Sequence, residues 1–251
     1  MENIFNPNKS PATTVIEGIP SRSKRKKGKP VMSQDIVLSL FDYTGIMVKP
    51  WAQAGFLCYC VDIRHPAGEQ REGNIVRIGA DIRTWLPPQG NVKIVFAFPP
   101  CTDVAVSGRA WFRNKGLGKL IEALELFHMT VRLAEWTKAP YMIENPVSTV
   151  STYWRKPDFI FDPCDFGGYL NPPADAYTKR TCLWTGNGFV MPKHKAVVPV
   201  EGSRMHRMGQ SADRAHHRSI TPKGFARAVF EANTDGFLKN LSQLGKIKGA
   251  R

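Results

Sequence analysis

Two residues that follow short apolar segments have the side chains needed for covalent catalysis. Cys101 comes after the apolar run Val92–Phe98 and the pair Pro99-Pro100, and Glu144 comes directly after Ala139–Ile143. A thiolate can add to an electrophilic carbon, while a carboxylic acid can protonate or anchor another atom of the same substrate. Strands of an open α/β sheet present their carboxyl ends to ligands. The two segments therefore predict a thiol and a carboxyl group at neighbouring strand ends, an arrangement suited to covalent catalysis.

The elements that position these residues follow a strand and helix alternation. Such a rhythm is typical of an α/β fold with a doubly wound, mostly parallel sheet. The helical period of the longest segment would cover one face of that sheet. The predicted strands are Ile36–Phe41, Phe56–Val61, Ile75–Ile78, Val92–Phe98 and Ala139–Ile143, and the predicted helices lie near Met47–Ala54 and Leu117–Trp136.

After Glu144 the helical pattern of apolar residues weakens, and Gly and Pro become frequent. Short strands are expected at Phe159–Phe161 and Thr181–Trp184, and a final helix is expected to begin at Thr221-Pro222, with threonine as its cap. We interpret 32–184 as the catalytic domain. Residues 185–251 form a small irregular substrate-side region and a C-terminal helix of the same domain. Residues 1–31, which include a run of Lys and Arg, are expected to be a disordered basic tail.

Composition limits the class of protein. With 251 residues, 42% of them hydrophobic, the chain can bury a sizeable core. It carries 35 Lys and Arg against 21 Asp and Glu, a net charge of +14, which favours a polyanionic partner such as nucleic acid. No membrane span or secretion signal is evident, so a cytoplasmic location is expected. The five cysteines include no CxxC pair, and we predict neither a disulfide framework nor a metal site.

The motifs between Ile36 and Trp184 resemble those of the DNA cytosine-5 methyltransferases, in particular compact members encoded by phages or prophages. Pro99-Pro100-Cys101 is similar to the nucleophile motif of that family, and Glu144-Asn145 is similar to its Glu-Asn-Val motif. The resemblance implies the fold of S-adenosylmethionine-dependent methyltransferases. It also implies methyl transfer to C5 of a cytosine that is flipped out of double-stranded DNA. Cys101 would add to C6, Glu144 would act at N3, and Asn145 would orient the strand end.

The same resemblance implies where the cofactor S-adenosylmethionine binds. The turn after the first strand would wrap the cofactor, Asp62 would hold the ribose hydroxyls, and Asp81 would lie near the adenine amino group. For each aspartate, the alternative is a strand-end acid that caps a helix. The sequence departs from the family pattern at Tyr43, which stands in place of a glycine, and at Ser39, which stands in place of an acid. The implied cofactor residues are Phe41, Thr44, Gly45, Asp62, Asp81 and Pro99.

Basic and small residues in three places are implied to contact the nucleic acid. Ser107 and Arg109 lie in the segment that resembles the loop closing over flipped DNA. Lys179 and Arg180 resemble the basic strand of the family, with Arg180 as the candidate substrate contact. The region between Trp184 and Thr221, where the family normally inserts a recognition domain, is short, and its arginines Arg204 and Arg218 are candidate DNA contacts.

Three other functions are compatible with these motifs. The chain could be a non-catalytic DNA-binding protein on a degenerate methyltransferase scaffold, which Tyr43, Ser39 and the short recognition region favour. It could methylate cytosine in RNA, because a flipped base offers the same ring. It could also use a different one-carbon donor. We expect no obligate protein partner, and a bacterial cell or a phage-infected host as the setting.

Overall fold

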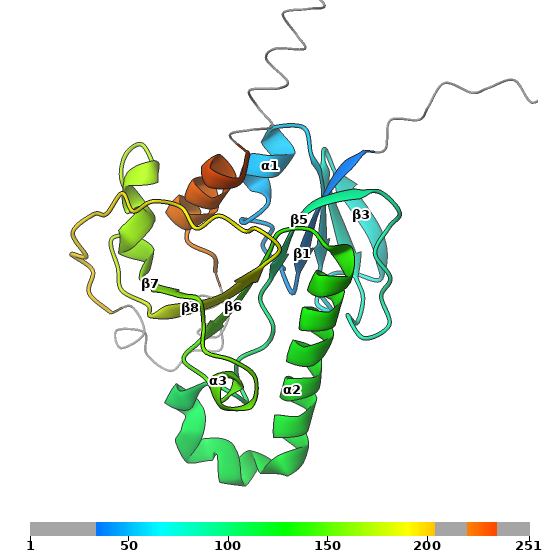
Figure 1. The fold of residues 1–251 in the computed structure, drawn as a ribbon, viewed down its shortest axis with the longest axis vertical. Helices are drawn as coiled ribbons and strands as arrows, with labels where there is room; N and C mark the ends of the chain where they lie inside the picture. Colours follow the sequence, from blue (N-terminus) through cyan, green and yellow to red (C-terminus); the bar gives the residue numbers. More distant parts are fainter. Residues whose placement is uncertain (1–33, 204–219, 235–251) are drawn as a thin grey trace, which may run out of the picture. The chain divides into compact units, whose positions relative to one another are not determined.

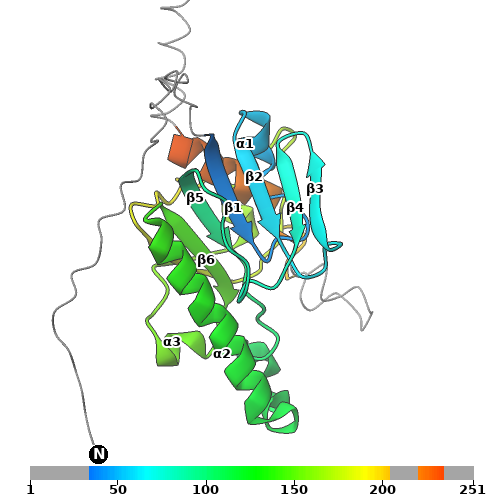
Figure 2. The ribbon, with the colours of Figure 1, turned by 90° about the vertical axis from the view of Figure 1, so that its right-hand side faces the viewer.

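The computed structural model describes residues 34–203 and 220–234. The chain divides into the units Met1–Met32 and Ser33–Arg251, and all described residues belong to the second. Within these residues, eight strands form one sheet in the order β3-β4-β2-β1-β5-β6-β8-β7 (Figures 1 and 2). The strands are β1 (Asp35–Leu40), β2 (Leu57–Val61), β3 (Gly68–Glu72), β4 (Ile75–Gly79), β5 (Asn91–Ala97), β6 (Tyr141–Pro146), β7 (Phe159–Phe161) and β8 (Thr181–Gly186).

The winding of the sheet reverses next to β1. Strands β4, β2, β1, β5 and β6 are parallel to their neighbours in this central block, whereas β3 and β8 are antiparallel to the strands they pair with. From β1 the chain proceeds to β2 and β4 on one side, and then returns to β5 and β6 on the other. Ligands of open α/β sheets bind at the carboxyl ends of the strands where the order reverses. We therefore expect a ligand to bind at the carboxyl ends of β1 and β5.

Helices cover both faces of the sheet because the central strands are apolar on both sides. On β1, Leu38 packs in one core cluster with Phe127 of the longest helix, while Val37 packs in the opposite cluster. That second cluster includes Trp51 and Phe230, whose ring centroids are 5.3 Å apart. The helical segments are α1 (Lys49–Gln53), η1 (Val106–Trp111), α2 (Phe112–Thr137), α3 (Val150–Tyr153), η2 (Pro163–Tyr169) and a helix in residues 223–234. Figure 2 shows α2 in front of the sheet and the orange helix behind it.

The α/β class and the predicted strands are confirmed, with small shifts at the strand ends. Strand β3 was not predicted, because Gly68–Glu72 contains no apolar residue and lies mostly exposed at the sheet edge. Helix α2 begins at Phe112, before the predicted start at Leu117. Gly116, with φ 78° and ψ 169°, interrupts it, so the uninterrupted helix does begin after that glycine.

The last predicted helix is present and is part of the core. Phe225 stacks on Phe161 of β7 with 4.3 Å between the ring centroids, and Val229 is fully buried. Residues 187–200, by contrast, contain neither helix nor strand, as expected for the irregular region after β8. Among the described helices, none has both the length and the apolar character that a membrane crossing requires.

Candidate functional site

Cys101 lies in a tight turn at the carboxyl end of β5. Its carbonyl oxygen accepts hydrogen bonds from the backbone N–H groups of Val104 at 3.1 Å and Ala105 at 2.8 Å. The side chain is partly buried and packs against the core cluster beneath α2. The prolines at 99 and 100 end the strand and direct the chain into this turn. The thiol is thus held at the sheet edge that the strand order marks for ligands.

Glu144 lies near the carboxyl end of β6, the strand next to β5. The two strands pair in parallel with Ala97 opposite Ile143, so the residues that follow them emerge side by side. The side-chain amide of Asn145 donates a hydrogen bond to the carbonyl oxygen of Pro99 at 3.0 Å, and Asn145 is fully buried. The structure therefore brings the segments of Cys101 and Glu144 together at one edge.

Backbone hydrogen bonds extend this junction into the following loops. The N–H of Val106 donates to the carbonyl oxygen of Val147 at 2.9 Å, and the N–H of Thr149 donates to that of Val104 at 2.9 Å. The loop after Cys101 and the loop after β6 are therefore joined by backbone hydrogen bonds as well as by the contact of Asn145.

The environment of Glu144 favours its neutral form. Burial raises the pKa of this carboxyl group, and the positive charge of Lys179 acts in the opposite direction. Lys179 is held by its backbone N–H, which donates to Asp162 at 2.7 Å. Burial raises the pKa of the thiol Cys182, and the exposed Arg180 acts in the opposite direction. Of the two basic residues predicted here, Lys179 is the one that acts on Glu144.

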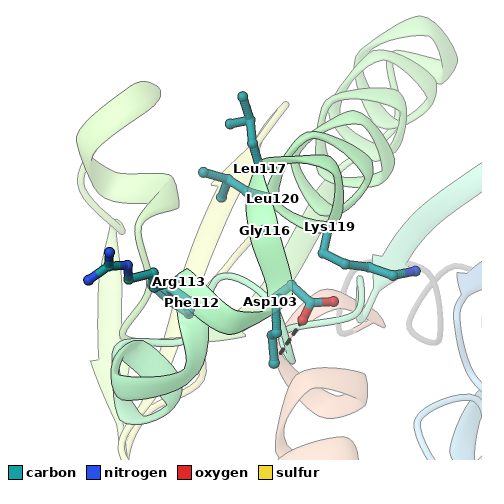
Figure 3. A pocket seen from close by; sticks show the side chains of 8 residues that line it. Asp103, Phe112, Arg113, Gly116, Leu117, Lys119 and Leu120 are labelled. Carbon is teal, nitrogen blue, oxygen red and sulfur yellow. Dashed lines mark ion pairs between the residues drawn. The ribbon is translucent and has the colours of Figure 1, made fainter.

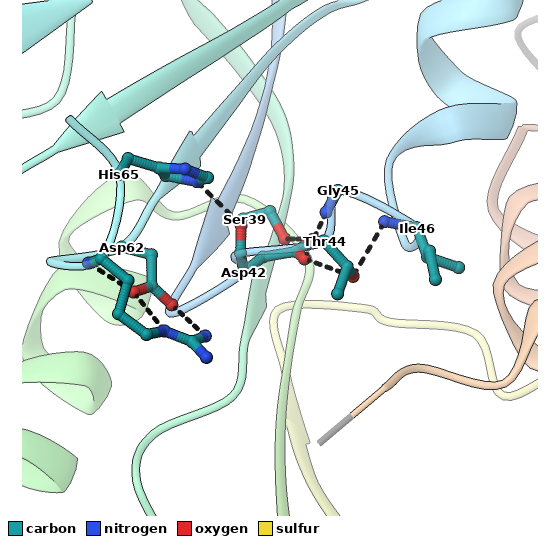
Figure 4. A network of polar contacts seen from close by, with 8 residues as sticks. Ser39, Asp42, Thr44, Gly45, Ile46, Asp62 and His65 are labelled. Atoms are coloured by element: carbon teal, nitrogen blue, oxygen red, sulfur yellow. Dashed lines mark hydrogen bonds and ion pairs between the residues drawn. The ribbon is translucent and has the colours of Figure 1, made fainter. Parts of the chain in front are cut away.

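The turn after β1 is built around a buried acid that sequence reasoning missed. Asp42 accepts hydrogen bonds from the Ser39 hydroxyl at 2.8 Å and the Gly45 N–H at 2.7 Å (Figure 4). Its pKa is raised by burial, against which these two hydrogen bonds act. The Thr44 hydroxyl also donates to Asp42, at 3.2 Å. The available signal was an acid directly after the predicted strand Ile36–Phe41 and three residues before a glycine.

The backbone of this turn is unusual. Phe41 has φ 57°, in the left-handed region that non-glycine residues seldom adopt, and Gly45 has φ 65°. Such backbone conformations persist only where the surrounding structure holds them in place, and they are frequent at binding sites. Phe41, Thr44 and Gly45 therefore form a preorganised turn at the carboxyl end of β1, next to the carboxyl end of β5.

Asp62, at the carboxyl end of β2, is buried and paired with Arg64. One carboxylate oxygen accepts from the backbone N–H and the Nε of Arg64, both at 2.9 Å, and the other accepts from a guanidinium NH2 at 2.7 Å. The guanidinium lies 4.6 Å from the centre of the Tyr43 ring, which stacks on His65. A carboxylate offers about four acceptor positions, so Asp62 retains one for a further donor.

Asp81 resembles Asp62 in sequence but is saturated. Both residues begin an Asp-Ile-Arg triplet after a strand. The two oxygens of Asp81 together accept four hydrogen bonds from three N–H groups of Arg83, because Nε–H is shared between both oxygens, and these bonds hold the pKa of this carboxyl below its usual value. The carbonyl oxygen of Asp81 also accepts from the backbone of Thr84 and Trp85, at 3.1 and 2.9 Å. No helix lies among the described residues between β4 and β5, so Asp81 caps a turn and not the helix that the sequence alternative predicted.

The predicted nucleic-acid residues lie in different parts of the fold. Ser107 and Arg109 are exposed on η1, which follows the Cys101 turn. Lys179 and Arg180 precede β8 and lie near Glu144. Arg204 and Arg218 lie outside the described residues. Within residues 34–203 and 220–234, no group of three His, Cys, Asp or Glu side chains could hold a metal ion.

A comparison with protein-family models finds no match, and no curated protein matches the sequence.

Proposed function

We propose that this protein transfers a methyl group from S-adenosylmethionine to C5 of cytosine in DNA. The observation that carries the proposal is the junction of two strand ends. Cys101 follows β5, and Glu144 lies near the carboxyl end of β6, the adjacent parallel strand; the Asn145 to Pro99 hydrogen bond joins the two. This is the arrangement that the resemblance to DNA cytosine-5 methyltransferases implies for nucleophile and acid.

The strand order adds support for that methyltransferase type of fold. A doubly wound sheet has helices on both faces and a reversal of strand order, and both features occur around β1. The turn at Phe41–Gly45 and the acid Asp62 follow β1 and β2, whereas Cys101 follows β5. The cofactor and the target base would therefore approach the same edge from the two sides of the reversal.

Cys101 and Glu144 act at different atoms of the cytosine ring. The Cys101 thiolate forms a bond to C6, which moves electron density toward C5. Glu144, which burial keeps protonated to a higher pH, donates at N3 as negative charge develops across the ring. After C5 has been alkylated, water or a base removes its proton, the S–C6 bond breaks, and the thiolate of Cys101 is restored.

The residues after β1 and β2 fit S-adenosylmethionine, which supplies an electrophilic methyl group when bound. The one acceptor position that Asp62 retains is suited to a ribose hydroxyl, and the left-handed turn at Phe41–Gly45 presents backbone groups to a ligand. Asp81 has no such position left. Within the cofactor site, we therefore assign the main role to Asp62 and the 41–45 turn.

The charge of the chain and the chemistry of the reaction both support DNA as the substrate polymer. The net charge of +14 favours a polyanion, and a base within a duplex must be extruded before a thiol can reach C6. Arg109, Lys179 and Arg180 are the described residues that we assign to phosphate or base contacts.

The test is to incubate the purified protein with mixed-sequence DNA and S-adenosylmethionine, digest the DNA and measure nucleoside masses. We expect 5-methylcytosine with the wild type and none with Cys101→Ala. Methylation that persists in Cys101→Ala would contradict the mechanism. Product from RNA alone would identify the RNA alternative, and a heavier cytosine adduct would identify another one-carbon donor.

A second candidate is a DNA-binding protein without catalysis. It is favoured by the Tyr43, Arg64 and His65 stack, which lies beside Asp62 where the family has a glycine-rich turn. Calorimetry separates the two functions, because the second predicts salt-sensitive DNA binding with no heat on titration of S-adenosylmethionine.

A further inference from the structure

The segment that follows the Cys101 turn projects beyond the sheet. It consists of η1 and the first turns of α2, and in Figures 1 and 2 the bent start of α2 lies past the ends of the strands. The bend is at Gly116, whose φ of 78° suits glycine. We call residues 106–121 the projecting segment.

Lys115 fastens the projecting segment to the Cys101 turn. Its ammonium group donates to the carbonyl oxygen of Thr102 at 2.8 Å and pairs with Asp103 at 2.8 Å. Inside the bend, Phe112, Leu120 and Gly116 line a hollow together with Asp103 (Figure 3). The segment is therefore held in a defined position next to the thiol.

Its outer surface combines positive charge with exposed apolar side chains. Between Asp103 and Glu122 the sequence contains four basic residues and no acid. Lys115 pairs with Asp103 and Lys119 pairs with Glu122, so the positive charge of the outer surface comes mainly from Arg109 and Arg113. Trp111, between the exposed Arg109 and Arg113, is 64% exposed. A large aromatic side chain exposed among cations is suited to a polyanion that also offers flat apolar surfaces, and a nucleic-acid duplex does so through its phosphates and bases.

We propose that Trp111 inserts into the base stack of the DNA duplex while Arg109 and Arg113 bind the adjacent phosphates. This inference rests on the proposed function, because it supplies the extrusion that methylation by Cys101 requires. Removing a base from the stack costs free energy, because the neighbouring bases lose their stacking contacts. An aromatic ring inserted into the gap restores part of that stacking and offsets the cost. The insertion would occur beside the thiol because Lys115 anchors the projecting segment there.

The test compares Trp111→Ala with a matched control, Trp136→Ala. Trp136 is 70% exposed near the C-terminal end of α2, the helix that begins directly after Trp111. Methylation is measured on duplex and single-stranded DNA of one mixed sequence. We expect Trp111→Ala to lose about tenfold or more on the duplex but little on the single strand, which needs no extrusion, and Trp136→Ala to be unchanged on both. Equal losses on both substrates, or no loss on the duplex, would overturn the insertion.

A physical measurement separates this inference from the proposed reaction. The full-length Cys101→Ala protein is added to a pool of duplexes that carry the fluorescent base 2-aminopurine beside a cytosine. We expect the emission of 2-aminopurine to rise on binding, and the rise to disappear in Cys101→Ala/Trp111→Ala while most of the DNA binding remains. A rise without any methylation by the wild type would refute the reaction and leave the insertion standing. A rise that does not depend on Trp111, no rise, or no DNA binding would refute the insertion.

Discussion

The side chain of Asn145 donates a hydrogen bond to the carbonyl oxygen of Pro99, with 3.0 Å between Nδ2 and the oxygen. The two residues are far apart in sequence; Pro99 follows β5, and Asn145 lies near the carboxyl end of β6, its parallel neighbour. This contact fixes the strand end that carries Glu144 relative to the turn that carries Cys101. Under the proposed function, this contact makes Asn145 a positioning residue for Cys101 and Glu144.

Asn145→Ala should lower kcat by about tenfold or more, because small displacements of reacting groups are costly. It should also lower the free energy of unfolding by about 1–3 kcal/mol, because the buried carbonyl group of Pro99 loses its donor. Urea denaturation and the methylation assay measure both effects. The control is Asn187→Ala, which removes a similar bond to the carbonyl oxygen of Ala139 at the opposite end of β6. It should destabilise without lowering kcat, and equal loss of activity would argue against positioning.

Glu144→Gln should change the pH dependence of stability. Burial raises the folded pKa of Glu144 above its ordinary 4.5, so the folded protein keeps a proton that the unfolded chain releases. The wild type therefore loses stability as the pH rises from about 4.5 through the folded pKa. Glutamine does not titrate, so the variant should lack this loss. Urea midpoints across that range, for wild type and variant, provide the measurement, and parallel curves would contradict the prediction.

Lys179→Gln should shift the pH profile of activity. The positive charge of Lys179 lowers the pKa of Glu144, so its removal should raise that pKa further. The limb of the kcat/KM profile that reports deprotonation of Glu144 should move to higher pH. Arg180→Gln is the control, because Arg180 is the adjacent cation; it should weaken DNA binding without moving the limb. A shift in both variants would show that general charge, rather than Lys179, acts on Glu144.

Asp62→Asn should weaken binding of S-adenosylmethionine by about tenfold or more, since hydrogen bonds to charged groups contribute about 1.5–3 kcal/mol. Asp81→Asn should leave the affinity nearly unchanged, because Arg83 occupies the acceptor positions of that carboxylate. Isothermal titration calorimetry distinguishes the two. A large effect of Asp81→Asn would mean that Arg83 moves aside when the cofactor binds.

Gly224→Ala should destabilise the protein by about 1–3 kcal/mol, because overpacking forces backbone shifts. A Cβ atom at this position would lie 2.4 Å from the carbonyl oxygen of Phe166, an atom that cannot turn away. Gly118→Ala, in α2, is the control. Its Cβ would meet no atom within 4 Å, and alanine favours a helix, so this variant should be neutral or more stable. Thermal unfolding measures both, and similar melting temperatures would contradict the expected contact.

Local signals in the sequence were sufficient to predict the central strands. β1, β2 and β5 are runs of apolar residues, so their burial and their ends could be read from the chain itself. The same signals failed for β3, which is polar and forms because β4 offers it an edge to pair with. They also failed for Asp42, because its role depends on hydrogen bonds within the turn, which a pattern of apolar residues does not reveal.

The sequence by itself determined which residue types stand at the strand ends, a thiol at 101, an acid at 144 and acids at 62 and 81. Only the tertiary structure decided which of these meet and which remain able to bind. The order of the strands places Asn145 against Pro99, and it follows from long-range pairing that no local period encodes. The two Asp-Ile-Arg triplets are identical in sequence, yet Asp62 keeps an acceptor position and Asp81 does not, because Nε of Arg83 donates to both oxygens of Asp81 whereas Nε of Arg64 donates to one oxygen of Asp62.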